Sequence, residues 1–273
     1  MSMPGATVAP EAGVLLAGTG IDKRFGGLQA LSNVTFAINH GEIYGLIGPN
    51  GAGKTSLFNV LTGIYIPNGG EFTFDGASLS GLKPNDVAAR GIARTFQNIR
   101  LFANLTALEN VMIGRHVRTR AGVWGAISRN ARTRAEEAAI EARAYELLEY
   151  VGVDKRANSL AKHLAYGDQR RLEIARALAT DPKLLALDEP AAGMNATETA
   201  SLKGLLNDIR KDGTTILLIE HDMKLVMSVC DRVLVLDYGK KIAEGPAADV
   251  QKDPSVIAAY LGGEVTLNMK GAA

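Results

Sequence analysis

The apolar residues of this chain form two kinds of pattern, and each predicts a different kind of strand. Residues 43–47, 184–187 and 214–219 are continuous apolar or β-branched runs, as in strands that are buried on both faces. Residues 14–36 instead alternate apolar and polar positions around Gly26, which predicts two antiparallel strands joined by a turn. The chain therefore combines buried parallel strands with an antiparallel unit.

Helical periodicity and turn residues fill the intervals between these strands. Helices are expected over residues 55–62 and 140–151, from residues 164–169 to about residue 180, and over residues 254–261. A turn is expected at residues 67–70, a strand at residues 71–76, and a hairpin over residues 232–242. This alternation of strand and helix is typical of an α/β fold.

Length, composition and charge limit the class of protein. With 273 residues, 47% of them hydrophobic, the chain can bury a large core in one domain or two lobes. Its net charge of +1 gives no global attraction for nucleic acid or an anionic membrane, and the single cysteine, Cys230, fits a reducing compartment. No apolar run reaches the roughly 18 residues of a membrane span, and the first basic residue is Lys23, so no secretion signal is expected. We expect a soluble cytoplasmic chain with a loose tail at residues 1–13.

One stretch completes the pattern G-x-x-x-x-G-K-[ST] without a mismatch, between the strand at residues 43–47 and the helix at residues 55–62. In such a loop, glycines let backbone N–H groups turn inward, the lysine reaches the β and γ phosphates, and the hydroxyl can ligate Mg²⁺. Its residues are Gly48, Pro49, Asn50, Gly51, Ala52, Gly53, Lys54 and Thr55. The context of strand, loop and helix predicts a phosphate-binding site.

Two adjacent carboxylates, Asp188 and Glu189, follow the predicted strand at residues 184–187. Ligands bind where the strands of open parallel sheets end, so this pair should face the phosphates. Adjacent side chains diverge on extended backbone, which would allow Asp188 to hold Mg²⁺ while Glu189 polarises a water. The alternative is a surface Asp-Glu-Pro turn. His221 also follows a predicted parallel strand, although a histidine there is more often structural than catalytic.

Four further features are open to two interpretations from the residues alone. Phe25 is either an adenine-stacking aromatic or, as its spacing favours, a core aromatic. Gln97 alone is typical of a solvated or capping residue. Residues 164–169 offer a second, weakly indicated anion-binding helix end. Residues 115–134 contain six arginines and no acid, which favours a solvated surface hairpin over a site for an anionic partner.

The order and spacing of these motifs resemble the ATP-binding subunits of ABC transporters over nearly the whole chain. Residues 94–97, 164–176 and 217–227 are, more narrowly, similar to the branched-chain amino-acid importer ATPases. The resemblance implies an α/β P-loop NTPase of ABC type, with a RecA-like mixed sheet core, an antiparallel β subdomain and an α-helical subdomain. It implies one ATP-binding domain at residues 14–262, in which residues 14–97 and 165–245 form the core and residues 98–164 the helical subdomain. Residues 246–273 would form a C-terminal helix and tail.

The resemblance also assigns roles to the candidate residues. It implies that Phe25 stacks on adenine, that His221 contacts the γ-phosphate, and that Gln97 joins Mg²⁺ and the water to the membrane partner. Glu189 would be the general base, with Thr55 and Asp188 at the metal. The implied nucleotide contacts extend from the loop to Ser56 and to the signature residues Ala165, Tyr166, Gly167 and Asp168.

Four positions depart from the family pattern. The signature commonly has Ser at Ala165 and Gln at Asp168, and the loop after Glu189 often ends in Leu-Asp where this chain has Met194 and Asn195. Losing one hydroxyl donor to phosphate costs about 1 to 3 kcal/mol of closed-dimer stability, while the Gly167 amide and the helix end remain. The change at Asn195 bears on communication across the dimer.

The resemblance implies ATP and Mg²⁺ as cofactors and a head-to-tail dimer, in which each ATP lies between one chain's loop and the other's signature. The second ATPase would be a related chain or a second copy. Transmembrane permease subunits would place a cytoplasmic helix around residues 97–102, with a periplasmic binding protein outside, so the chain would lie on the inner face of the membrane. No nucleic acid is expected. The alternatives are the ATPase of a lipid or lipopolysaccharide export system, and a soluble ABC protein acting on ribosomes or DNA.

Overall fold

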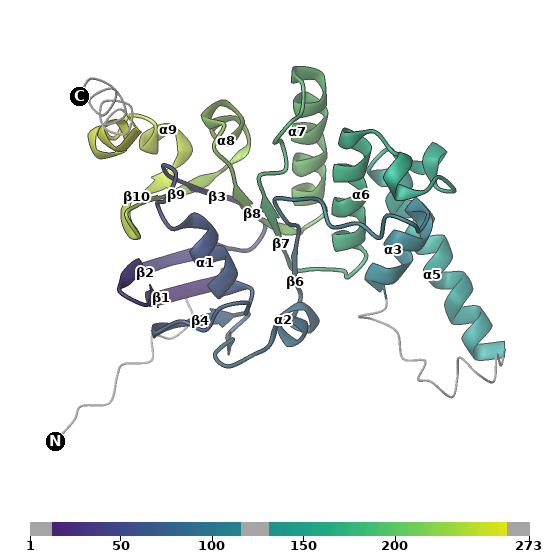
Figure 1. Ribbon diagram of the computed structural model, residues 1–273, viewed down its shortest axis with the longest axis horizontal. Helices are drawn as coiled ribbons and strands as arrows, with labels where there is room; N and C mark the ends of the chain where they lie inside the picture. The colour runs from purple at the N-terminus through teal and green to yellow at the C-terminus, as the bar shows by residue number, and fades with distance from the viewer. Residues whose placement is uncertain (1–12, 116–130, 261–273) are drawn as a thin grey trace.

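The computed structural model describes residues 13–115 and 131–260, which contain two sheets and their helices (Figure 1). The first sheet is antiparallel, in the order β2-β1-β4-β5, and the second is mixed, in the order β10-β9-β3-β8-β7-β6. The first comprises β1 (Val14–Phe25), β2 (Leu28–Asn39), β4 (Gly69–Phe74) and β5 (Ala77–Ser78). The second comprises β3 (Ile43–Ile47), β6 (Ile92–Arg94), β7 (Leu184–Asp188), β8 (Thr215–Ile219), β9 (Arg232–Asp237) and β10 (Lys240–Pro246).

Helices α3, α5 and α6 gather on the side of the molecule away from the antiparallel sheet (Figure 1). The helices are α1 (Lys54–Leu61), α2 (Pro84–Arg90), α3 (Ala107–Arg115), α5 (Ala131–Tyr150), α6 (Tyr166–Leu178), α7 (Ala196–Lys211), α8 (Met223–Val229) and α9 (Ala247–Val250). Short 3₁₀ turns, η2 (Asp154–Arg156) and η3 (Ala161–His163), precede α6, and residues 254–260 are helical. No helix within the described residues is both long and apolar enough to cross a bilayer.

The continuous apolar runs are explained by two cores, one on each face of the mixed sheet. Successive side chains of a strand point to opposite faces, so every residue of a covered strand is buried. In β7, Leu185 and Leu187 join the core that includes α6 and α7, whereas Leu184 and Ala186 join the core that includes α1 and the antiparallel sheet. The strands β3, β8 and β9 alternate in the same way.

The fold class, the antiparallel pair around Gly26 and the buried strands are confirmed. The turn predicted at residues 67–70 is wrong in part, because Gly69 and Gly70 belong to β4. A Cβ on Gly70 would lie 2.3 Å from the Gly20 carbonyl oxygen, so this glycine permits close approach of two strands. The strand β6 was not predicted, since three residues are too few for a periodic signal. Residues 1–12 of the N-terminal tail, residues 116–130 of the arginine-rich segment and residues 261–273 of the predicted C-terminal helix and tail lie outside the described residues.

The packing of α3 against α6 depends on Gly114. A Cβ at Gly114 would lie 2.2 Å from the carbonyl oxygen of Arg176 on α6, so the two helices lie closer than any side chain would permit. By contrast, Gly204 lies exposed within α7, where an added Cβ meets no atom within 4 Å. Replacing these two glycines by alanine should therefore change the stability of the fold in opposite directions.

We expect Gly114→Ala to lower the free energy of unfolding by about 1 to 3 kcal/mol, because the new methyl forces α3 away from α6. Gly204→Ala, the matched control, should raise it by about 0.5 to 1 kcal/mol by favouring the helix. Urea unfolding followed by circular dichroism measures both values. Equal stability of the two variants would contradict the role of Gly114.

Candidate functional site

The predicted phosphate loop is a tight turn between β3 and α1, and three of its glycines have left-handed backbone conformations. The φ angle is 149° at Gly48, 81° at Gly51 and 102° at Gly53. A Cβ on Gly48 would lie 2.1 Å from the carbonyl oxygen of Leu236, and one on Gly53 would lie 2.6 Å from that of Ala30. Glycine is needed at both positions, because of the φ angle and because neighbouring strands lie against the loop.

The other loop residues differ in exposure. Ala52 is buried, and its carbonyl oxygen accepts a hydrogen bond of 2.9 Å from the Gly239 amide, while Asn50 is exposed. Thr55, the second residue of α1, is exposed and Ser56 is half-buried. The Thr55 residue therefore lies open to a ligand at the N-terminal end of a helix, where anions bind favourably.

Lys54 is buried in the loop that it belongs to. Its Nζ donates hydrogen bonds to the carbonyl oxygens of Gly48 (2.6 Å) and Pro49 (3.0 Å). Burial lowers the pKa of Lys54, and the carboxylates of Glu189 and Asp188 oppose that effect. The loop cation and the carboxylates at the end of β7 thus lie close enough to interact.

Asp188 ends β7 and is 6% exposed. Its amide donates a hydrogen bond of 3.3 Å to the Thr95 hydroxyl oxygen, beyond the end of β6. Burial raises the pKa of Asp188; the Arg94 guanidinium opposes this effect and the Glu189 carboxylate adds to it. The fold therefore holds this carboxylate in a position where its charge costs free energy.

The expectation that the backbone stays extended from Asp188 to Glu189 is wrong. Glu189 has a φ of 47°, in the left-handed region that is unusual for residues other than glycine. Its amide donates a hydrogen bond of 2.9 Å to the carbonyl oxygen of Ile219, which ends β8. A backbone turn therefore follows Asp188, and it is held by the neighbouring strand.

Gln97, Glu189 and His221 come together where β6, β7 and β8 end. The Gln97 Nε2 donates a hydrogen bond of 3.0 Å to Glu189 Oε2, and His221 Nδ1 lies 3.6 Å from the same oxygen. Glu220 is 1% exposed, and its carboxylate accepts hydrogen bonds from the amides of Ala191 (2.9 Å) and His221 (3.2 Å). Burial raises the pKa of Glu220, against these hydrogen bonds. The three predicted polar side chains thus form one cluster around a carboxylate.

The signature residues lie at the start of α6. Ala165 is the N-cap and makes no side-chain cap, Tyr166 is exposed, and Asp168 is half-buried in the first turn. Gly167 is buried, and a Cβ there would lie 2.8 Å from Glu198 Oε1. In Figure 1, strands β7 and β8 lie between α6 and α1, so the structure does not bring the signature to the phosphate loop of the same chain.

Asn195 begins α7 with a complete capping box. Its side chain accepts a hydrogen bond of 3.0 Å from the Glu198 amide, and its own amide donates one of 2.9 Å to Glu198 Oε2. Asn and Asp are equally good N-cap residues. The Asn195 residue, which stands where the family often has Asp, therefore caps α7 as well as an Asp would.

Phe25 lies on the surface at the end of β1. Its side chain is 40% exposed, so the core interpretation favoured by its spacing is wrong. The ring makes an edge-to-face contact with Tyr65 at 5.1 Å, and the Lys23 ammonium lies 4.9 Å from its centroid. An aromatic ring is therefore available to a ligand at this surface.

Sequence reasoning missed three buried polar groups near these residues. Arg170 and Glu173 form a fully buried ion pair in α6, and two opposite charges three residues apart on a buried helix face are a signal that could have been read. The Tyr260 hydroxyl is buried without a hydrogen bond of ordinary geometry. Burial raises the pKa of Tyr260, against the neighbouring Gly48 N–H, so the C-terminal helix reaches the phosphate loop.

Comparison with known proteins identifies the class. A family model described as ABC transporter matches residues 31–192, and one described as branched-chain amino acid ATP-binding cassette transporter matches residues 240–266. The chain belongs to the ABC transporter family, and it is an ATPase of that family.

Individual relatives match this chain over most of its length. The high-affinity branched-chain amino acid transport ATP-binding protein LivG of Salmonella typhimurium is 48% identical over 91% of this chain and 98% of its own length. The corresponding protein BraF of Pseudomonas aeruginosa is 46% identical over 89% of this chain and 96% of its own. A solved ATP-binding cassette in its ADP conformation has a TM-score of 0.80 at 31% identity, covering 91% of this chain and 99% of that one. The resemblance predicted from the motifs is confirmed.

Because Asp188 is buried with a raised pKa, we expect Asp188→Asn to raise the free energy of unfolding of the nucleotide-free chain at pH 7. A carboxyl group whose folded pKa exceeds its unfolded value costs stability when ionised, and this cost disappears below the unfolded pKa of about 3.9. The gain should therefore shrink as the pH falls from 7 towards 4. Thermal unfolding at several pH values measures it, with the exposed Asp249→Asn as control. A gap that is absent at pH 7, or that grows on acidification, would contradict the expectation.

Proposed function

We propose that this chain is the ATP-hydrolysing subunit of an importer for branched-chain or related amino acids. The observation that carries the ATP-hydrolysing role is the hydrogen bond from Gln97 to Glu189 at the end of β7. The substrate class is supported by relatives that are named for branched-chain amino acid transport, and by the matching family model at residues 240–266.

The phosphate loop, Lys54 and the N-terminal end of α1 bind the triphosphate of ATP, because they supply backbone N–H groups and a buried cation. Phe25 stacks on the adenine. Thr55, Asp188 and Gln97 offer the oxygen ligands that Mg²⁺ prefers. When bound, Mg²⁺ neutralises charge on the β and γ phosphates.

Glu189 acts as the general base for the attacking water. Gln97 holds Oε2 of Glu189 at 3.0 Å, which fixes the carboxylate and gives the Gln97 amide access to the same water. His221, 3.6 Å from that oxygen, contacts the γ-phosphate. The carboxylate of the buried Glu220 accepts a hydrogen bond from the backbone amide of His221, and so fixes the backbone that carries the imidazole.

The signature completes the site of a second subunit. Ala165, Tyr166, Gly167 and Asp168 lie at a helix N-terminus away from their own phosphate loop, as a head-to-tail dimer requires. A solved dimer of an ATP-binding cassette with ADP and phosphate, 26% identical with a TM-score of 0.73 over 85% of this chain and 99% of that one, supports the arrangement. The partner ATPase is a related chain or a second copy of this one.

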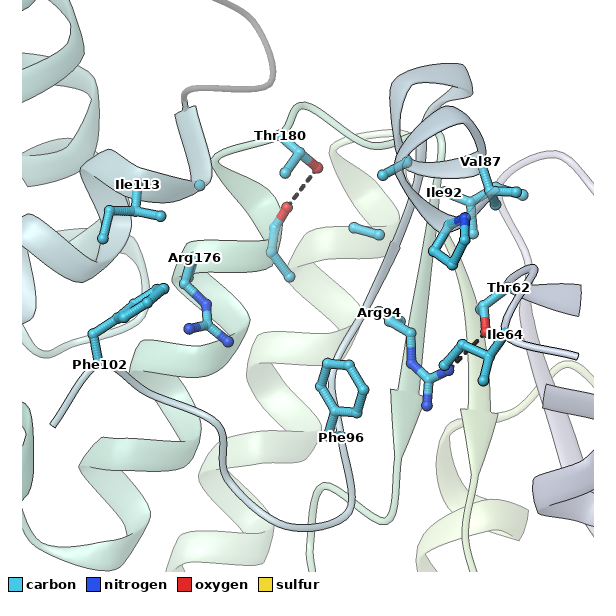
Figure 2. A pocket seen from close by; sticks show the side chains of 15 residues that line it. Thr62, Ile64, Val87, Ile92, Arg94, Phe96, Phe102, Ile113, Arg176 and Thr180 are labelled. Carbon is cyan, nitrogen blue, oxygen red and sulfur yellow. Dashed lines mark hydrogen bonds between the residues drawn. The ribbon is translucent and has the colours of Figure 1, made fainter. Parts of the chain in front are cut away.

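A groove between α2 and the pair α3 and α6 fits the cytoplasmic helix of a permease subunit. Figure 2 shows the groove, a pocket of about 390 Å³ with Arg94 and Arg176 on opposite sides of a mainly apolar lining. The lining includes Val87, Phe96 and Phe102. An amphipathic helix docks in such a groove through apolar anchors. Because Gln97 directly follows Phe96 of the lining, a helix bound in the groove would lie next to the segment that carries Gln97. Permease contact here places the chain on the inner face of the membrane, with a periplasmic binding protein on the other side.

The alternatives receive no comparable support. The relatives with 46 to 48% identity are named for amino acid transport, rather than for lipid export or for action on ribosomes or DNA. Of the six arginines in residues 115–134, which were the only support for a nucleic-acid partner, three lie at positions 116–130, outside the described residues.

We expect Glu189→Gln to keep ATP binding and to lower kcat for ATP hydrolysis by about 100-fold or more, because the amide cannot accept the water's proton. Fluorescent ATP titration and phosphate release measure the two quantities. The exposed Glu149→Gln on α5, which makes the same chemical change, should leave both unchanged. Hydrolysis at the wild-type rate in Glu189→Gln would remove Glu189 from this role.

A further inference from the structure

Helix α6 contains a charged pair that is completely withdrawn from solvent. The side chains of Arg170 and Glu173 are 0% and 1% exposed, and Arg170 Nη1 lies 3.0 Å from Glu173 Oε2. A buried ion pair costs several kcal/mol in lost hydration, so it is weak evidence for a role in stability alone. The hydrogen bonds of the pair to the rest of the chain therefore indicate its role.

Arg170 holds the backbone of the segment that carries Gln97. Its Nη1 donates a hydrogen bond of 2.7 Å to the Phe96 carbonyl oxygen, and its Nη2 donates one of 2.8 Å to the Gln97 carbonyl oxygen. Nη2 also lies 3.1 Å from the Tyr166 hydroxyl, in the signature. One guanidinium thus joins the start of α6 to two successive carbonyls beside the hydrolysis site.

Glu173 holds the same segment through its amides. Its Oε1 accepts hydrogen bonds of 3.4 Å from the backbone N–H groups of Phe96 and Arg100. The Phe96 ring is also fixed, because the guanidinium carbons of Arg94 and Arg100 each lie 4.4 Å from its centroid. The backbone of residues 96–100 is therefore attached to α6 by both its donors and its acceptors.

The backbone and the side chain of Gln97 make hydrogen bonds to different elements. While its carbonyl is bound to α6 through Arg170, its Nε2 donates to Glu189 on β7. Gln97 is thus the residue where the signature helix and the catalytic carboxylate meet. A displacement of α6 is therefore transmitted through Arg170 to the backbone from which the Gln97 side chain extends.

We propose that Arg170, held in place by Glu173, is a positioning residue that couples the signature helix to Gln97. When the signature meets nucleotide bound to the second subunit, the resulting placement of α6 sets the placement of the Gln97 amide against Glu189. This inference rests on the proposed function, since it gives Arg170 no role except through Gln97. Arginine is required because its planar fork donates to two carbonyls at once, which a lysine ammonium on a flexible stem cannot do in that geometry.

The test removes both charges together, because removing one would leave the other buried and unpaired. In the full-length chain, Arg170→Met with Glu173→Leu should keep the ATP Kd close to wild type, while its melting temperature falls because the Phe96 and Gln97 carbonyls lose their donors. We expect kcat to fall about 10- to 100-fold, the loss typical of a displaced catalytic group. Arg170→Lys, which keeps the ion pair and the fold, should give a smaller loss of kcat with unchanged Kd. Arg171→Met is the matched control, because that arginine donates to Ser201 and the Val151 carbonyl instead.

A double-mutant cycle with Gln97→Ala separates coupling from a purely structural effect. If Arg170 acts through Gln97, adding Gln97→Ala to the Met/Leu variant should lower kcat no further than Gln97→Ala alone. Wild-type kcat in both the Arg170→Met/Glu173→Leu variant and Arg170→Lys would overturn the inference. So would a combined variant whose loss of kcat is the product of the losses caused by Gln97→Ala and by the Met/Leu change. If the Met/Leu variant does not fold, the same cycle with Arg170→Lys decides in the same way.

The same variants show which claim fails. A wild-type kcat in Gln97→Ala would contradict the proposed role of Gln97, and the inference would fall with it. A slow Gln97→Ala beside a fast Met/Leu variant would leave the proposed function standing and overturn the inference alone.

Discussion

The hydrogen bond from Gln97 to Glu189 depends on how the parallel strands end. The strands β6, β7 and β8 are neighbours in one sheet, paired through Arg94 with Ala186 and Asp188 with Ile219. Each strand is followed by one polar side chain of the cluster within a few residues. Parallel strands end at the same edge of a sheet, so three residues far apart in sequence meet without further arrangement. The two apolar cores that cover the sheet keep this edge in register.

The site is formed at a cost in stability. Asp188 and Glu220 are carboxylates with pKa values raised by burial, Lys54 is an ammonium with a lowered pKa, and Glu189 has a left-handed backbone. Each of these opposes folding, and each lies beside the phosphate loop or at the ends of β7 and β8. Such destabilising features are common at functional sites, because the surrounding fold is stable enough to hold them. The buried strands of the mixed sheet supply that stability here.

The parts of the fold that could be predicted from sequence were those with a local signal. The phosphate loop has a fixed pattern, and β3, β7 and β8 are continuous apolar runs, so each can be recognised within ten residues. The strand β6 has only three residues, and the exposure of Phe25 depends on its packing against Tyr65, forty residues further along the chain. The left-handed turn at Glu189 and the contacts of Arg170 with Phe96 depend on the folded chain, so no local pattern indicates them.

The central claim is that this ATPase drives an amino acid importer. The decisive measurement is purification of the tagged wild-type chain from native membranes, with mass spectrometry of the proteins that accompany it. We expect permease subunits, a second ATPase chain or copy, and an amino acid binding protein. Recovery of lipid-export components, or of ribosomes without any membrane subunit, would contradict the claim while leaving ATP hydrolysis intact.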